Sequence, residues 1–149
     1  MDRHRPALFA LPLATWERGG LKAALTRAGL PADDVDNGGP LFWRFERDDV
    51  PVGFAGIEVH GTDALLRSLI TLPPVRQQGI GGAMIDKMEV EARARGASAI
   101  YLLTRDFVPF FAKLGYAACG RDRLPPAIAA AGPFAEPSLA DGTQMVKQV

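Results

Sequence analysis

Three glycines, Gly79, Gly81 and Gly82, lie in the stretch RQQGIGG, which follows two prolines and precedes a strongly helical segment. The N-terminus of a helix leaves several backbone N–H groups unpaired and carries partial positive charge. Without side chains at that point, phosphate oxygens can approach these N–H groups closely. Arg76 would add charge or order the loop. The pattern predicts a phosphate-binding helix entrance, or else a strand-to-helix turn in which the glycines only relieve steric crowding.

Two common nucleotide-binding motifs do not fit this stretch. The P-loop ends in Gly-Lys-Ser/Thr, whereas this chain continues Gly81-Gly82-Ala83. The dinucleotide fingerprint G-x-G-x-x-G would need its third glycine where Met84 stands. A different phosphate-binding interpretation of the stretch is a pyrophosphate site for coenzyme A.

The elements that must position this loop can be predicted from patterning. Ile80, Met84 and Met88 form one apolar stripe at helical spacing. Asp48-Asp49 and Gly61-Thr62 are turn signals between successive strands, which favours antiparallel pairing. We expect strands at residues 7–10, 41–47, 52–60, 64–72, 98–104, 116–119 and 142–148, and helices at 15–28, 79–95 and 106–114, with a helical turn in 125–131. This order predicts an α+β (mixed α/β) fold with helices on both faces of a sheet.

Composition limits the class of protein. The 149 residues are 48% hydrophobic and 23% charged, which predicts one globular domain over residues 1–149. The 17 basic and 17 acidic residues cancel, so we expect no nucleic-acid partner. No apolar run reaches about 18 residues, and the apolar N-terminal stretch is too interrupted for a signal peptide, so we expect no membrane segment. The single Cys119 fits a reducing compartment, and a cytoplasmic location is predicted.

The spacing Arg76-x-x-Gly79-x-Gly81 is the central motif of the GCN5-related N-acetyltransferase (GNAT) superfamily, and the chain resembles that superfamily over nearly its whole length. The resemblance includes the apolar strand at 100–104 and the Phe-Phe-x-Lys-Leu-Gly-Tyr stretch at 110–116. It implies the GNAT fold, a mostly antiparallel twisted sheet with one splayed parallel strand pair, and acetyl-CoA as cosubstrate.

A narrower similarity links the chain to small acetyltransferases associated with arsenic-resistance gene clusters. It is carried by residues 30–31, 65–69, 101–104 and 125–128. This chain has Ser138-Leu139 where that group carries a Cys-Pro step. The similarity therefore gives no support to a substrate or metalloid role that depends on that cysteine. We expect no metal site.

The superfamily resemblance implies where the coenzyme binds. In the superfamily the pantetheine arm lies between the splayed strands and bonds like a substitute strand, while the pyrophosphate meets the glycine loop. A backbone N–H around Ile70 would polarise the thioester carbonyl. The cofactor-binding residues implied here are Leu69, Ile70, Thr71, Arg76, Gln77, Gln78, Gly79, Ile80, Gly81, Gly82 and Thr104.

Acetyl transfer to an amine needs a proton acceptor, because an alkyl amine with a pKa of about 10.4 is mostly charged at pH 7. Glu58 is our leading candidate, since it lies on a mostly apolar strand. The alternative is that Glu58 lies on a solvated face or pairs with Arg67. His60 is a second candidate base, expected in an exposed turn, and Arg67 could instead bind a substrate carboxylate.

The departing thiolate lacks its usual proton donor. The superfamily often places a tyrosine on the short helix where this chain has Phe111. Thiols have a pKa of about 8.5, so a thiolate can leave without full protonation. Tyr116 is the predicted catalytic phenol, although Tyr101 and Tyr116 would more commonly be core aromatics with satisfied hydroxyls. Trp16 could line the acceptor entrance.

The function predicted is transfer of an acetyl group from acetyl-CoA to a small amine, such as an amino-acid-like metabolite or toxin. Two alternatives remain open. One is a catalytically weak CoA-binding sensor, and the other is an acetyltransferase for protein N-termini or lysines. The segment from Leu124 to Gly142 would be a lid or a contact in a homodimer.

Overall fold

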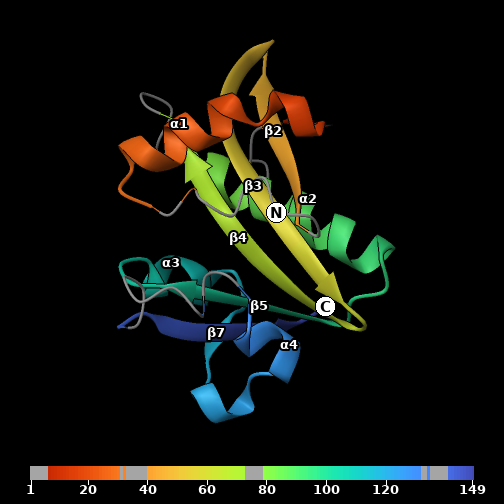
Figure 1. The fold of residues 1–149 in the computed structure, drawn as a ribbon, viewed down its shortest axis with the longest axis vertical. Helices are drawn as coiled ribbons and strands as arrows, with labels where there is room; N and C mark the ends of the chain where they lie inside the picture. Colours follow the sequence, from red (N-terminus) through yellow and green to blue (C-terminus); the bar gives the residue numbers. More distant parts are fainter. Residues whose placement is uncertain (1–6, 31, 33–39, 73–78, 132–133, 135–140) are drawn as a thin grey trace.

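The computed structural model describes residues 7–30, 32, 40–72, 79–131, 134 and 141–149. A mixed sheet forms its centre, with strand order β1-β2-β3-β4-β5-β7-β6 (Figure 1). The elements are β1 (Phe9–Pro12), a 3₁₀ turn (Thr15–Glu17), α1 (Gly19–Arg27), β2 (Leu41–Arg47), β3 (Val50–His60), β4 (Asp63–Thr71), α2 (Ile80–Ala94), β5 (Ala99–Thr104), α3 (Val108–Lys113), β6 (Ala117–Ala118), a second 3₁₀ turn (Arg121–Arg123), α4 (Pro126–Ala129) and β7 (Thr143–Gln148).

The two β-turns predicted from sequence join β2, β3 and β4 into an antiparallel meander. Asp48 and Asp49 both adopt positive φ angles, 53° and 65°, in the two-residue turn between Arg47 and Val50. Such angles match the right-handed twist of the flanking strands, and aspartate tolerates them better than most residues. Gly61, with a φ of 65°, serves the β3–β4 turn. Among the described strands, only β4 and β5 pair in parallel.

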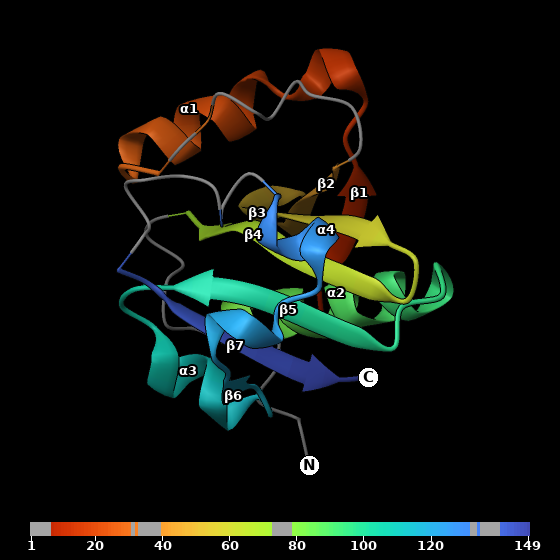
Figure 2. The ribbon, with the colours of Figure 1, turned by 60° about the horizontal axis from the view of Figure 1, so that its bottom comes forward.

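Helices cover both faces of the sheet, as the sequence predicted (Figure 2). The apolar stripe of α2 and the inner side of α3 bury one face, with Met84, Met88 and Phe111 in this core. On the opposite face, α1 packs over Phe54 and Ile70, and α4 packs over Leu65. The opposite face therefore carries two separate apolar clusters, one beneath α1 and the other beneath α4.

The expected first helix differs from the observed one. Residues 15–17 form a 3₁₀ turn, and α1 begins only at Gly19. The predicted N-cap, Thr15, is therefore wrong, because it lies inside the 3₁₀ turn, where Ala14 is the preceding residue. The glycine pair does not interrupt the α-helix, because Gly19 and Gly20 are its first two residues.

A buried polar cluster ties α2 to the C-terminal part of the sheet. Tyr116 donates its hydroxyl to the carboxylate of Glu89 at 3.0 Å, and the Lys147 ammonium donates to both oxygens of the same carboxylate at 3.1 Å. The ammonium also lies 5.6 Å from the centre of the Tyr116 ring. Burial, together with the nearby Glu89 carboxylate, raises the pKa of Tyr116 far above its ordinary value.

We predict that Tyr116→Phe lowers the free energy of unfolding by about 2 kcal/mol at pH 7, because a buried hydrogen bond to a charged group is lost. Denaturant titration measures this. Tyr101→Phe is the control, since its hydroxyl has no hydrogen-bond partner among the residues described. Equal stability of Tyr116→Phe and the native chain would mean that the bond contributes nothing.

The same substitution should change the response to alkaline pH. The folded protein keeps the Tyr116 proton, whereas the unfolded chain loses it above about pH 10. The unfolded state then binds fewer protons, so stability falls as the pH rises further. Tyr116→Phe should lose less stability than the native chain between pH 9 and pH 11, in the same titration. A steeper loss in the variant would contradict this.

Candidate active site

The two parallel strands at the centre of the sheet separate along their length. β4 and β5 pair only over Asp63–Leu65 and Ala99–Tyr101, although β4 continues to Thr71 and β5 to Thr104. Figure 1 shows the two strands diverging toward their C-terminal ends. Beyond Leu65 the backbone edges of the two strands face each other without pairing. The splayed pair that the sequence predicted is confirmed.

A β-bulge in β4 accounts for this separation. The register between β3 and β4 shifts by one residue, so that Ser68 and Leu69 together lie opposite Ala55. Ser68 adopts a positive φ of 57°, which is uncommon for a residue other than glycine. A bulge bends its strand and increases the local twist. The predicted pantetheine contacts Leu69, Ile70 and Thr71 follow it, in the part of β4 that has left β5.

The glycine loop ends in a helix N-terminus. Gly79 has a left-handed φ of 75°, and the first hydrogen bond within α2 runs from the Ala83 N–H to the Gly79 carbonyl at 3.2 Å. The N–H groups of Ile80 and Gly81 precede that bond, so they can serve an acceptor outside the helix. The predicted contacts Arg76, Gln77 and Gln78 lie outside the described residues.

Gly81 has a structural role that the sequence did not reveal. A Cβ atom on this residue would lie 3.0 Å from the ring of Phe110 in α3. The absence of a side chain therefore lets α3 pack against the start of α2. The sequence offered ligand approach or steric relief within the turn for this glycine, and it did not identify Phe110, because the contact joins elements that lie far apart along the chain.

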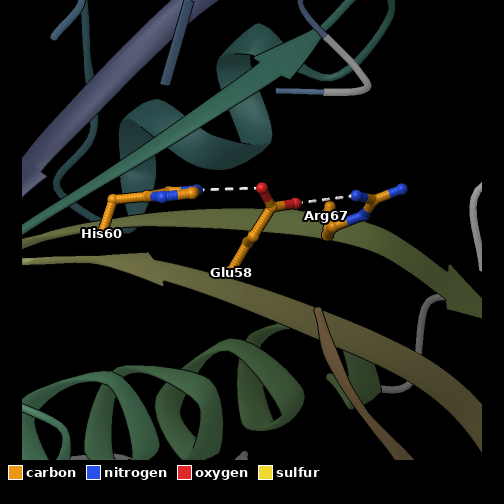
Figure 3. A network of polar contacts seen from close by, with 3 residues as sticks. All are labelled: Glu58, His60 and Arg67. Atoms are coloured by element: carbon orange, nitrogen blue, oxygen red, sulfur yellow. Dashed lines mark hydrogen bonds and ion pairs between the residues drawn. The ribbon is translucent and has the colours of Figure 1, made fainter. Parts of the chain in front are cut away.

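Glu58, His60 and Arg67 form a polar cluster, which we call the carboxylate cluster (Figure 3). One carboxylate oxygen of Glu58 accepts from the Arg67 guanidinium at 2.9 Å, and the other lies 2.9 Å from Nε2 of His60. The exposed fraction of the side chain rises along the cluster, from 4% for Arg67 to 13% for Glu58 and 35% for His60. The pairing of Glu58 with Arg67, one of the two alternatives drawn from the sequence, is confirmed.

The carboxylate cluster lies on the face opposite α2. Ile57 and Val59 pack in the core beneath α2, so Glu58 and His60, which alternate with them along β3, face the other way. The cross-strand partner of Glu58 is Leu65, which is fully buried beneath the α4 cluster. The cluster is therefore bounded by α4 on one side and by α1 on the other.

The ring of Phe42 packs against the guanidinium of Arg67. Phe42, Gly56 and Arg67 are successive cross-strand partners on one face of β2, β3 and β4. Because Gly56 has no side chain, the Phe42 ring occupies its place and comes within 5.8 Å of the Arg67 guanidinium. The Arg18 guanidinium, from the residue before α1, lies 4.9 Å from the same ring. Sequence reasoning missed Arg18 and Gly56. The available signal for Gly56 was a glycine in an alternating strand, at a position that faces bulky residues on both neighbouring strands.

The remaining predicted residues do not join this cluster. The Thr104 hydroxyl accepts from the Phe107 N–H at 3.1 Å, just before α3. Trp16 is exposed on the 3₁₀ turn before α1. Tyr116 belongs to the core on the α2 face, where it donates to Glu89. The structure therefore does not bring Tyr116 and Glu58 together, and the catalytic role of Tyr116 stays a prediction.

The model of the acetyltransferase (GNAT) family matches residues 6–116. The chain therefore belongs to the acetyltransferase (GNAT) family, and the resemblance seen in the sequence is confirmed. The similarity to the arsenic-cluster group stays a prediction. None of the described helices is both long and apolar enough to span a membrane.

Individual relatives agree with this family. N-alpha-acetyltransferase 80 of Mus musculus is 36% identical over 52 residues, which are 35% of this chain and 17% of that protein. N-acetylglutamate synthase from Neisseria gonorrhoeae, solved with coenzyme A and N-acetyl-glutamate, superposes with a TM-score of 0.79 at 15% identity, over 97% of this chain and 35% of that chain. Rv2747 from Mycobacterium tuberculosis, solved with CoA and NLQ, superposes with a TM-score of 0.70 at 18% identity, over 97% and 99%.

The structural likeness at these identities shows a shared fold. The chain spans only about a third of the synthase and a smaller part of the murine enzyme. Both structures support the GNAT fold predicted from the sequence.

We predict that Gly56→Ala disrupts the carboxylate cluster. The added Cβ would lie 2.5 Å from the Phe42 ring, so the ring must move away from Arg67. Overpacking of this kind costs about 1–3 kcal/mol in the free energy of unfolding. Denaturant titration measures the loss. Gly19→Ala, in the first turn of α1 with no heavy atom within 4 Å of the added carbon, is the control and should not destabilise the chain. A stable Gly56→Ala variant would contradict the packing described.

Proposed function

We propose that the chain is an N-acetyltransferase that transfers the acetyl group of acetyl-CoA to the amine of a small molecule, by direct attack on the thioester. The observation that carries this proposal is the carboxylate of Glu58, largely buried on β3 beside the strand that separates from β5. Membership of the acetyltransferase (GNAT) family supports it. So does the fold shared with two proteins solved in complex with coenzyme A.

The proposed coenzyme site has two parts. The pantetheine arm would lie along the edge of β4 after the bulge, with backbone contacts from Leu69, Ile70 and Thr71. The pyrophosphate would meet the start of α2, where the N–H groups of Ile80 and Gly81 precede the first intrahelical bond. When bound, the coenzyme supplies an acetyl group activated as a thioester. The part of β4 that has separated from β5 and the polar helix start both fit such a ligand.

Glu58 would take the proton of the acceptor's ammonium group, which frees the nitrogen lone pair for attack. The Arg67 guanidinium holds one carboxylate oxygen, so the orientation of the base is fixed before the acceptor arrives. A backbone N–H around Ile70 would donate to the thioester oxygen. The thiolate would leave without a dedicated acid and take up the second proton of the attacking nitrogen, because Phe111 is buried at the usual tyrosine position and Tyr116 is bonded to Glu89.

The surroundings of Glu58 favour a small acceptor. Leu65 beside it is covered by Leu124, Ile128 and other α4-side residues, while the α1 cluster closes the opposite end. An extended peptide would need an open path across this face. A protein N-terminus is nevertheless the second candidate acceptor, since the 52-residue match to an N-alpha-acetyltransferase favours it.

The proposal is tested by thiol release from acetyl-CoA with three groups of acceptors: the free amino acids, polyamines, and short peptides with free N-termini. We expect turnover with members of the first two groups. Turnover confined to the peptides would favour the second candidate. Binding of acetyl-CoA by calorimetry without turnover of any amine would favour a CoA sensor.

We predict that Glu58→Gln lowers kcat at neutral pH by about 100-fold or more, the usual contribution of a general base. The matched control is Glu46→Gln, because Glu46 also pairs with an arginine, Arg44, at 2.9 Å but lies near the far edge of the sheet. Both variants should bind acetyl-CoA like the native chain. Full activity of Glu58→Gln across the pH range would remove Glu58 as the base.

A further inference from the structure

We propose that His60 carries the acceptor's proton from Glu58 to solvent. This inference rests on the proposed function, because the proton originates from the amine that is acetylated. It gives a role to His60, the half-exposed residue of the carboxylate cluster. Capture of the proton by Glu58 does not itself require this residue.

Of the two described residues that contact the Glu58 carboxylate, one can accept its proton. Arg67 holds one oxygen of Glu58 and cannot take a proton, because a guanidinium is already protonated throughout the physiological range. The other oxygen lies 2.9 Å from Nε2 of His60 (Figure 3). His60 is the last residue of β3, and its side chain is the most exposed of the three. The cluster therefore runs from the interior to solvent with His60 at its outer end.

Each turnover leaves one proton on Glu58, which must be lost before the next acceptor can be deprotonated. With its ring proton on Nδ1, the imidazole of His60 accepts at Nε2: the Glu58 O–H bond breaks and the Nε2–H bond forms. The resulting imidazolium releases one proton to water, and exchange with solvent restores either neutral form. The carboxylate of Glu58 is then ionised again, with no proton gained or lost overall by the protein.

Several charged or titratable groups surround this relay. Glu58 lies on the same strand as His60, Asp63 is the cross-strand partner of His60 on β4, and Arg67 lies further along β4. On β5, Tyr101 pairs with Leu65, and burial together with the Asp63 carboxylate raises the pKa of its phenol. The relay uses the imidazole in its neutral form, because a ring that carries both protons has no nitrogen left to accept one.

The test compares His60→Gln and His60→Asn with the native chain, using the free amino acid that turns over fastest. Glutamine can keep a hydrogen bond to Glu58 but cannot carry a proton. We expect kcat to fall about tenfold in both variants, with the KM for acetyl-CoA unchanged. Added imidazole should restore a large part of kcat in both. In a Glu58→Gln background, His60→Gln should cause no further loss, because the relay then has no proton to carry.

Three results would overturn the relay. A native kcat in His60→Gln would show that the proton leaves by another route. A loss of kcat that added imidazole does not restore would mean that His60 only positions Glu58. Full activity of His60→Gln together with a loss of kcat in His60→Asn would mean the same. These outcomes differ from failure of the proposed function, in which the native chain itself would turn over no amine. Melting temperatures of His60→Gln and His60→Asn, measured beside the native chain, would check that both variants fold.

Discussion

The extra residue in β4 is the constraint on which the site depends. By placing Ser68 in a left-handed conformation, the bulge turns the second half of β4 away from β5. Backbone groups that a regular parallel sheet would pair internally then become available to another extended chain. The same bulge keeps Arg67 and Ile70 on one face although they are three residues apart, which aligns the guanidinium with the α1 cluster. One irregularity therefore shapes both the coenzyme side and the acceptor side.

The carboxylate cluster shows how a charged group can be held inside an apolar layer. Glu58 uses both of its oxygens, one toward a buried cation and the other toward a half-exposed ring. Its orientation does not depend on solvent, because the Phe42 ring and the missing side chain of Gly56 fix where the guanidinium lies. The apolar clusters beneath α1 and α4 meet the cluster from both ends. A base with this support is already oriented before the acceptor arrives.

Much of the fold could be predicted from local signals. The turn residues Asp48-Asp49 and Gly61 and the stripe of α2 lie in or beside the elements that they predict, so β3, β4 and α2 were placed within about two residues. The GNAT resemblance supplied the splayed pair. Other features depend on contacts between distant elements. The approach of Phe110 to Gly81, of Arg18 to Phe42 and of Tyr116 to Glu89 each joins residues more than twenty positions apart, and no sequence period encodes such pairs.

The separation of β4 from β5 divides the sheet mechanically into two leaves joined by a short seam. Three residue pairs form that seam, and all of them lie at one end of the strands. A further connection is made by Glu89 of α2, a helix packed beneath β3 and β4, which binds Lys147 of β7 on the other leaf. This ion pair and the apolar core around it join the two leaves on the α2 face. The gap open to a ligand on one face of the sheet therefore lies between leaves whose packing contacts include those on the other face.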